Sequence, residues 1–346
     1  MTNPASVRRP AAHWKRTSGG KVQCLLCPFN CVLAEGKTGV CKGKTNIGGD
    51  LVAVNYGLTT SVSMDPMEKK PLYHFLPGSS ILSVGPNGCN LSCDFCQNYH
   101  ISQGRAATKF VSPEDLAAMA VANGSAGVAY TYSEPLIWFE YVMDAARAVR
   151  GRGLANVLVS NGYINPEPLA ELLPWIDAMN LDIKSMDPVF YKKVCKSALP
   201  PVLQTARAAA GKVHLEITNL LIPGLNDDKG NIEKLTDFVA GLDDKIPLHF
   251  SRYFPAYKRT TPPTPPETME MAARIASEKL KYVFVGNIDL GRWKNSVCPG
   301  CGKTLIDRTG YMVKEVALDG EKCRACGCPP AVVTMLNKSA PGRSPR

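Results

Sequence analysis

The stretch GPNGCNLSCDFCQNY, residues 85–99, places Cys89, Cys93 and Cys96 on one short segment. This CxxxCxxC spacing lets three thiolates bind three irons of a [4Fe–4S] cubane, which leaves the fourth iron open to an outside ligand. An open coordination position is what metal catalysis requires. A zinc knuckle is the alternative, but it usually has a fourth ligand at similar spacing, and only His100 follows closely. We therefore predict an iron–sulfur cluster on this loop.

From Ser79 to Val285, short apolar segments alternate with helical patterns. The segments are SILSVG (80–85), GVAYTY (127–132), NVLVSN (156–161), AMNLDI (178–183), VHLEITNLLI (213–222), PLHFSRY (247–253) and KYVFVG (281–286). Helical patterns lie between them at 112–123, 135–150, 166–173, 202–210, 230–240 and 265–279. This repeat of strand, helix and strand is typical of a parallel sheet. We predict an α/β fold, a partial (β/α)6 TIM-like barrel, with its chemistry at the carboxyl ends of the strands.

A second group of cysteines precedes the barrel. Residues 21–50 contain Cys24, Cys27, Cys31 and Cys41 among turn residues, with few apolar side chains. Such a stretch needs a metal to stay folded. Four thiols form a complete ligand set, and either zinc or a second [4Fe–4S] cluster would satisfy it.

A third group follows the barrel. Cys298, Cys301, Cys323 and Cys326 form two CxxC pairs about twenty residues apart. This pattern predicts a zinc-ribbon-like module over 291–334, with mononuclear iron as the alternative metal.

The remaining organisation follows from these modules. The barrel is expected over 51–290, and the ends, 1–20 and 335–346, are expected to be disordered. Cys195 and Cys328 stand outside the cysteine groups and receive no role from the sequence.

The net charge of +10 could suggest a nucleic-acid partner. However, eight of the basic residues lie within 1–22 or after Leu336, and the rest of the chain is near +2. We interpret these as solvated tails and expect no nucleic-acid partner. The chain has no apolar run long enough for a membrane span or a signal peptide, so we expect a cytoplasmic protein without a membrane partner.

The cysteine loop, with aromatic Phe95 before its last cysteine, resembles the radical S-adenosylmethionine (SAM) superfamily. Longer stretches resemble the radical SAM enzymes of the AmmeMemoRadiSam system, and the pyruvate formate-lyase activating enzymes are similar more distantly. These stretches are MDPMEKKPLYHFLPGS (64–79), YSEPLIWFEYVMD (132–144), FYKKVC (190–195), ITNLLIPGLND (217–227) and HFSRYFPAYK (249–258). The resemblance implies a radical SAM barrel in which Cys89, Cys93 and Cys96 are catalytic and SAM chelates the fourth iron.

The resemblance also implies SAM contacts at the strand ends. Ser133, Glu134 and Pro135 stand where the superfamily has a Gly-Gly-Glu-Pro stretch, and Glu134 would accept a hydrogen bond from the SAM ammonium. The alternative for Glu134 is the common role of an acid at a helix N-terminus.

Residues after the third and fourth strands correspond to positions that hold SAM in the activating enzymes. Ser160, Asn161, Asp182 and Lys184 would contact the carboxylate and ribose of SAM. For Lys184, a surface lysine at a strand end is an equally good interpretation.

The substrate side is the least determined. His249, Arg252 and Tyr253 end the sixth segment and are candidate substrate contacts, although a core histidine and a paired arginine explain them almost as well. Because Arg252 and Lys258 could bind an anion, we expect a small anionic molecule or a peptide as substrate. The alternatives are a glycyl-radical enzyme activase and, outside catalysis, an iron–sulfur electron-transfer or zinc-scaffold protein.

Partners are implied by the chemistry and by the resemblance. Reductive cleavage of SAM needs an electron donor such as flavodoxin or ferredoxin. The AmmeMemoRadiSam resemblance implies Memo-like and AMMECR-type protein partners.

Overall fold

A computed structural model of the chain describes residues 9–336 and contains a central eight-stranded sheet. Its strands are β8 (Ser61–Pro66), β9 (Ser80–Gly85), β11 (Gly127–Tyr130), β12 (Ala155–Ser160), β13 (Ala178–Asp182), β14 (His214–Leu221), β15 (Leu248–Arg252) and β16 (Val283–Gly286). From β9 to β16 neighbouring strands are parallel and follow chain order. These are the seven predicted segments, so the predicted α/β fold with a mostly parallel sheet is confirmed.

The edge strand β8 was not predicted. It pairs with β9 in the antiparallel sense, from Ser61 opposite Gly85 to Pro66 opposite Ser80. Its residues are largely half-buried or exposed, so the segment lacks the continuous apolar run of the buried parallel strands.

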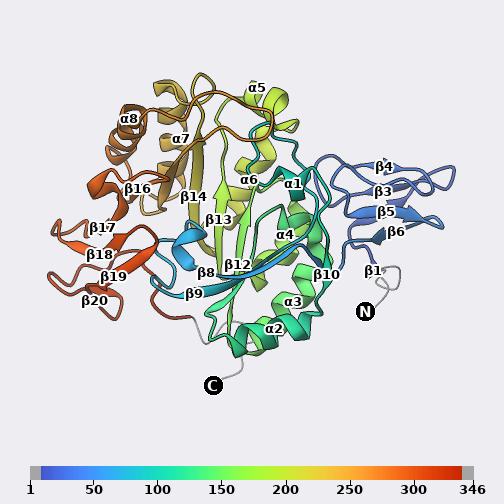
Figure 1. Ribbon diagram of the computed structural model, residues 1–346, viewed down its shortest axis with the longest axis horizontal. Helices are drawn as coiled ribbons and strands as arrows, with labels where there is room; N and C mark the ends of the chain where they lie inside the picture. The colour runs from blue at the N-terminus through green and yellow to red at the C-terminus, as the bar shows by residue number, and fades with distance from the viewer. Residues whose placement is uncertain (1–8, 337–346) are drawn as a thin grey trace.

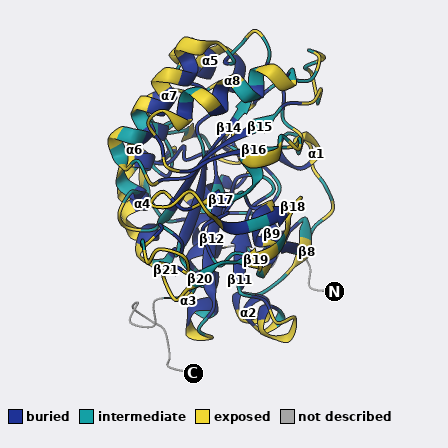
Figure 2. Cartoon of the chain, turned by 90° about the vertical axis from the view of Figure 1, so that its left-hand side faces the viewer, coloured by how far each residue is buried: buried dark blue, intermediate teal, exposed yellow. Residues whose placement is uncertain are grey.

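Helices cover the outer face of the sheet. They are α2 (Pro113–Ala122), α3 (Phe139–Gly151), α4 (Pro166–Leu172), α6 (Leu199–Ala209), α7 (Lys229–Leu242) and α8 (Pro266–Ser277), with the short helices α1 (Tyr99–Ser102), η3 (Pro135–Trp138), η4 (Leu173–Trp175), α5 (Pro188–Phe190) and η5 (Tyr191–Cys195). Side-chain caps begin two of the long helices, α2 and α7: the Ser112 hydroxyl accepts from Asp115 N, and Asp228 accepts from Asn231 N. Figure 2 shows the strands buried beneath helices whose outer faces are exposed.

The N-terminal module is built from short strands at one side of the barrel (Figure 1). Its sheets have the orders β1-β6-β5 and β2-β3-β4, and a two-stranded pair joins β7 to β10. The bounds are β1 (Arg9–Pro10), β2 (Trp14–Arg16), β3 (Val22–Cys24), β4 (Val32–Leu33), β5 (Lys44–Ile47), β6 (Asp50–Ala53), β7 (Leu58–Thr59) and β10 (Lys109–Phe110).

One prediction about this region was wrong. Residues 9–16, expected in a disordered tail, form β1 and β2. Contacts to helix α3 hold them: Arg9 pairs with Asp144 at 3.0 Å, and Ala12 N donates to Glu140 at 2.9 Å. These partners lie more than one hundred residues away, so the local composition did not reveal them. Residues 1–8 and 337–346, also predicted to be disordered, lie outside the described residues.

The C-terminal module lies at the opposite side of the barrel, beyond β16 (Figure 1). It contains η6 (Gly291–Lys294), β17 (Ser296–Val297), β18 (Thr304–Thr309), β19 (Met312–Val316), β20 (Leu318–Asp319) and β21 (Lys322–Cys323). Arg308 joins it to the barrel: this side chain is fully buried and lies 3.5 Å from Glu68 in η2 (Met67–Lys69). Within residues 9–336, no helix has the length and apolar character needed to cross a lipid bilayer.

Candidate active site

The three-cysteine loop and the carboxyl ends of the strands line one cavity of about 560 Å³. This volume lies in the range of small-molecule and cofactor sites. Cys89, Cys93 and Cys96 all contribute to its wall, together with the ends of β12 and β13. The structure therefore brings the predicted cysteines and the predicted strand-end residues together in one place.

Hydrogen bonds to sulfur shape the cysteine loop. Leu91 N donates to the Cys89 sulfur at 3.3 Å, and the Asn161 amide lies 3.6 Å from the same atom. The Cys96 sulfur lies 3.2 Å from the Ser102 hydroxyl. Donors of this kind stabilise thiolate charge and help to set the potential of a bound cluster. The loop thus offers three sulfurs and their polar support without a fourth sulfur ligand in the loop itself.

A fourth thiol, Cys195, lies behind the loop. It is fully buried at the end of η5, and its carbonyl accepts from Ser92 N at 3.0 Å. A hydrogen bond from the Cys195 thiol lowers the pKa of the Cys93 thiol. Local sequence patterns could not assign a role to Cys195, because this contact joins residues about one hundred positions apart.

Glu134 lines the cavity, and its carboxylate oxygens accept three hydrogen bonds from the protein. Its Oε1 accepts from Leu136 N at 3.0 Å and from the Ser160 hydroxyl at 2.7 Å, and its Oε2 accepts from Asn161 N at 2.8 Å. Burial raises the pKa of Glu134 to about 7, although these three donors act in the opposite direction. Glu134 therefore fixes the end of β12 and caps η3, and its contact with SAM stays a prediction.

The neighbouring strand-end residues surround this carboxylate. Ser133 and Asn161 line the cavity, while Pro135 is buried at the start of η3. The Ser133 hydroxyl donates to Pro86 O at 2.7 Å, which joins the second strand end to the cysteine loop. Tyr132 has a left-handed φ of 70° and sends its hydroxyl to Asp65 at 2.7 Å.

Asp182 and Lys184 form an ion pair on the cavity wall, with 3.1 Å between Lys184 Nζ and Asp182 Oδ2. Burial lowers the pKa of Lys184, but the negative charges of Asp182, Cys93 and Cys195 together outweigh it and hold the pKa above its ordinary value. The ammonium also lies 5.9 Å from the centre of the Phe95 ring, next to the cysteine loop. Lys184 is thus a charged wall residue of the cavity and not a solvated surface lysine.

Of the three candidate substrate contacts at the sixth strand, only His249 lines the cavity. The Nε2 of His249 lies 2.6 Å from Glu216. Tyr253 is completely buried, and Arg252 donates to the Thr264 carbonyl at 2.7 Å; neither is among the residues that line the cavity. Arg252 and Tyr253 therefore organise the segment after β15, and the predicted direct contact fails for Tyr253 because its side chain is in the core.

Other cavity residues were missed by sequence reasoning. Lys69, Lys70 and Tyr73 come from the segment around η2, and Tyr311 comes from the hairpin of the C-terminal module. Asp65 accepts from both lysines, at 2.8 and 2.7 Å, and these bonds lower its pKa against the effect of burial. The resemblance already included residues 64–79, but only the fold shows that this segment faces the cavity.

A further missed contact holds the cysteine loop from outside. Arg259 forms a two-point ion pair with Asp94, which stands between Cys93 and Phe95. Lys258 N also donates to Asp94 O at 2.9 Å. The predicted anion-binding segment after β15 is thus bound to the cysteine loop itself.

The four C-terminal cysteines lie close enough together to hold one metal ion. The sulfurs of Cys298, Cys301, Cys323 and Cys326 all lie within 4.8 Å of one another. Two of the sulfur separations are 3.6 Å, between Cys298 and Cys326, and 3.9 Å, between Cys301 and Cys323. Tetrahedral zinc with bonds of about 2.3 Å needs sulfurs about 3.8 Å apart. This set can hold a metal ion, and its spacing fits zinc.

The chain is similar to one protein-family model and to several known proteins. Residues 84–236 match the family model described as the radical SAM superfamily. The chain is 42% identical over 328 residues to the uncharacterized protein MJ0808 of Methanocaldococcus jannaschii, covering 92% of this chain and 98% of that protein. It is 29% identical over 172 residues to the pyruvate formate-lyase 1-activating enzyme of Escherichia coli, covering 46% of this chain and 70% of the enzyme.

Among solved structures, a domain of the pyruvate-formate lyase-activating enzyme of Bacteroides vulgatus is similar with a TM-score of 0.42 and 23% identity. The match covers 47% of this chain and 100% of that domain. The cysteine loop lies inside the matched family region. Its three thiols and the cavity that they line fit the cofactors of that family. The chain belongs to the radical SAM superfamily, whose members bind a [4Fe–4S] cluster and SAM, and it is related to the pyruvate formate-lyase activating enzymes.

Proposed function

We propose that this chain reductively cleaves SAM and uses the resulting radical on a small anionic molecule or a peptide. The observation that carries the proposal is the three-cysteine loop on the wall of a cavity of about 560 Å³. Three thiols leave one iron of a cubane open, and a passive site would close that position. When bound, the cluster and SAM supply one electron and a sulfur–carbon bond that breaks to give a 5′-deoxyadenosyl radical.

The residues of the chain position these groups and exclude water. Cys89, Cys93 and Cys96 would hold the cluster, with Asn161 and Leu91 N donating to the Cys89 sulfur. The ends of β11, β12 and β13 would hold SAM. Glu134 keeps the backbone at Ser160 and Asn161 in place, which orients the polar edge of the cavity.

A local pair of lysines on the cavity wall would suit an anionic substrate, although Glu68, Glu134 and Asp182 also line the cavity. Lys69 lines the cavity with its side chain about half exposed, and Lys70 lies beside it. Asp65 is shared between both lysines and a tyrosine hydroxyl, so one carboxylate offsets two cations. We therefore assign the anion contact to Lys69 in place of Arg252, whose guanidinium is bonded within its own segment.

Activation of a glycyl-radical protein is the second candidate. It is favoured by the names of relatives, among them the activating enzyme of (2S)-3-sulfopropanediol dehydratase of Klebsiella oxytoca, 33% identical over 114 residues. That match covers 33% of this chain and 36% of the enzyme. A stable glycyl signal in electron paramagnetic resonance (EPR), formed when the reduced chain acts on such a protein, would decide for this candidate.

Partners follow from the proposal. Cleavage of SAM consumes one electron for each radical formed, so a one-electron donor of the flavodoxin or ferredoxin kind is required. The resemblance to AmmeMemoRadiSam enzymes suggests that Memo-like and AMMECR-type proteins take part in the reaction.

The experiment is an anaerobic assay. The chain, reconstituted with iron and sulfide, is reduced and incubated with SAM, and 5′-deoxyadenosine and methionine are measured. We expect both products from the native chain and neither from Cys93→Ala. Cys328→Ala is the matched control, because Cys328 lies in the C-terminal module and outside the cavity. Equal product from the native chain and Cys93→Ala would contradict the proposal.

A further inference from the structure

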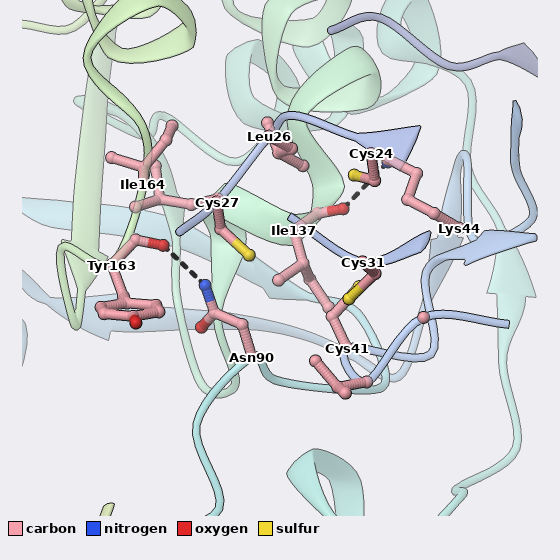
Figure 3. A pocket seen from close by; sticks show the side chains of 13 residues that line it. Cys24, Leu26, Cys27, Cys31, Cys41, Lys44, Asn90, Ile137, Tyr163 and Ile164 are labelled. Carbon is pink, nitrogen blue, oxygen red and sulfur yellow. Dashed lines mark hydrogen bonds between the residues drawn. The ribbon is translucent and has the colours of Figure 1, made fainter. Parts of the chain in front are cut away.

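The four N-terminal cysteines surround a second, small cavity. Cys24, Cys27, Cys31 and Cys41 all line it, and Figure 3 shows their side chains around it. The free space inside this cavity is about 10 Å³, room for one water-sized sphere, so the lining side chains would have to move outward to hold a cubane. The thiols thus stand around a void and form a ligand set of their own, separate from the cavity of the three-cysteine loop.

The spacing of these thiols differs from that of the C-terminal set. The sulfurs of the four C-terminal cysteines all lie within 4.8 Å of one another, and no other group of three or more potential ligand atoms in residues 9–336 does so. The N-terminal thiols are not gathered this closely. Zinc binds all four sulfurs at one ion and draws them to about 3.8 Å from one another. A cubane binds each sulfur at a different iron and therefore needs a wider set.

A buried cation compensates for negative charge beside the four thiols. Lys44 lines the cavity and is 1% exposed. Its Nζ donates to Ile137 O at 3.1 Å and lies 2.5 Å from Glu140 Oε2. Burying a lysine is costly unless it has charged partners. Four thiolates on a metal centre would be anionic, and Lys44 lies beside them while it shares its charge with Glu140.

The second cavity lies directly behind the three-cysteine loop. Asn90 lines the second cavity, while its chain neighbours Cys89 and Leu91 line the large one. Gly88 packs so closely on the N-terminal module that a Cβ there would lie 2.2 Å from the Cys41 carbonyl oxygen. One loop thus separates the two sets of thiols.

Hydrogen bonds connect the two sides of this loop. The Asn90 amide donates to Tyr163 O at 2.7 Å, a bond drawn in Figure 3, and the Asn161 amide donates to Asn90 Oδ1 at 3.0 Å. The same Asn161 amide lies 3.6 Å from the Cys89 sulfur. On the outer side, Val40 lines the second cavity and is 56% exposed. The second site therefore reaches from the protein surface to the cysteine loop.

We propose that Cys24, Cys27, Cys31 and Cys41 bind an auxiliary [4Fe–4S] cluster that passes electrons to the cluster of the three-cysteine loop. This role rests on the proposed function, whereas the binding of a cluster does not. In each transfer the auxiliary cluster loses one electron and the second cluster gains it. An external one-electron donor of the flavodoxin or ferredoxin kind then reduces the auxiliary cluster again.

The first test is the metal content of the full chain after anaerobic reconstitution with iron and sulfide. We expect about eight irons and eight sulfides in the native chain, and about four of each in the triple variant Cys89→Ala, Cys93→Ala, Cys96→Ala. The EPR signal of the reduced triple variant should not change when SAM is added, because all four irons of that cluster have thiolate ligands. Cys328→Ala should keep the native iron content.

The triple variant leaves the N-terminal set intact, so it decides the matter even if variants of that set fail to fold. A triple variant without iron, or with zinc at the N-terminal set, would overturn the proposal. SAM cleavage by a native chain with only about four irons would overturn it too, while the proposed function would stand. A native chain with about eight irons and no SAM cleavage would leave the auxiliary cluster and refute the function.

The second test addresses electron transfer. Freeze-quench EPR follows the rate at which the SAM-sensitive cluster is reduced in the native chain and in Cys27→Ala/Cys31→Ala. With a flavodoxin-type donor we expect the rate in the variant to fall at least tenfold, and with dithionite, which reaches the open cavity directly, to change little. Equal rates with the protein donor would refute the transfer role.

Discussion

The three-cysteine loop and the C-terminal ribbon use the same side chain for opposite purposes. In the ribbon, four sulfurs lie within 4.8 Å of one another and would complete the coordination of one ion. In the loop, three sulfurs line a cavity of about 560 Å³ and would leave one iron of a bound cluster open to a reactant. The number of cysteines therefore does not define a metal site, whereas their spacing and the space beside them do.

The two regions also depend on metal to different degrees. The ribbon has a small core of its own, formed by residues such as Leu305, Ile306 and Val332 together with two of the cysteines. The loop is held by contacts that need no metal, among them the Arg259–Asp94 ion pair and the packing of Gly88 against the N-terminal module. The ribbon should therefore require its metal to fold, and the loop should not.

The largest expected effect is on the ribbon. Cys298→Ser should remove about one zinc per chain and unfold the ribbon, because metal binding supplies much of the folding free energy of such modules. Cys93→Ser should leave the zinc content and the melting of the barrel unchanged. Zinc analysis and calorimetry check both variants. A Cys298→Ser chain that kept its zinc and its melting profile would remove the basis of the comparison.

The junction between ribbon and barrel gives the next effect. Arg308→Met should destabilise the chain by about 3–5 kcal/mol, because it leaves the Glu68 carboxylate buried without its partner. Urea unfolding measures this loss. The double variant Arg308→Met/Glu68→Gln should recover part of it. A single variant with native stability would show that the ion pair does not hold the ribbon in place.

The next effect concerns Glu134, which holds the end of β12 at the cavity. In Glu134→Gln one oxygen becomes an amide that cannot accept the same donors, so the end of β12 should shift and SAM affinity should fall about tenfold or more. Iron content should stay native, because Glu134 is not a cluster ligand in this account. Equilibrium binding of SAM measures the effect. Native affinity would mean that the strand end is held without this carboxylate.

The same residue predicts a pH dependence of stability. Burial raises the pKa of Glu134 from 4.5 to about 7, so between these values the folded chain keeps a proton that the unfolded chain has released. The stability from this proton is complete below pH 4.5 and is lost as the pH rises to about 7. Its size is on the order of 3 kcal/mol. Urea unfolding as a function of pH should show this slope in the native chain, and Glu134→Gln should flatten it.

The smallest expected effect is at the substrate side. Lys69→Met should leave SAM cleavage without substrate near the native rate and reduce its stimulation by an anionic substrate a few-fold, since the lysine is half exposed and its charge is screened. Arg252→Met should change this stimulation less, because its guanidinium is bonded to the Thr264 carbonyl. The opposite order would return Arg252 to the substrate contact predicted from the sequence.

The parallel strands and the cysteine groups were readable from the sequence, because both depend on local patterns. A buried parallel strand such as β11 is a continuous apolar run, and CxxxCxxC and CxxC are fixed spacings. The edge strand β8 has neither property and was missed.

The details of the site were less readable, because they depend on contacts between distant segments. Glu134 meets Ser160 and Asn161 more than twenty residues away, and Tyr311 reaches the cavity from another module. Tyr253 is a residue type that often binds ligands and it follows a strand end, but the fold places its side chain in the core. No periodicity or motif reports such placements.

The variant Cys27→Ala/Cys31→Ala should carry a cluster at the three-cysteine loop alone. EPR of this reduced variant tests most directly whether the loop holds a cluster with one open iron. We predict a [4Fe–4S] signal whose shape changes when SAM is added, because SAM binds the open iron. A cluster signal that SAM leaves unchanged would contradict the account.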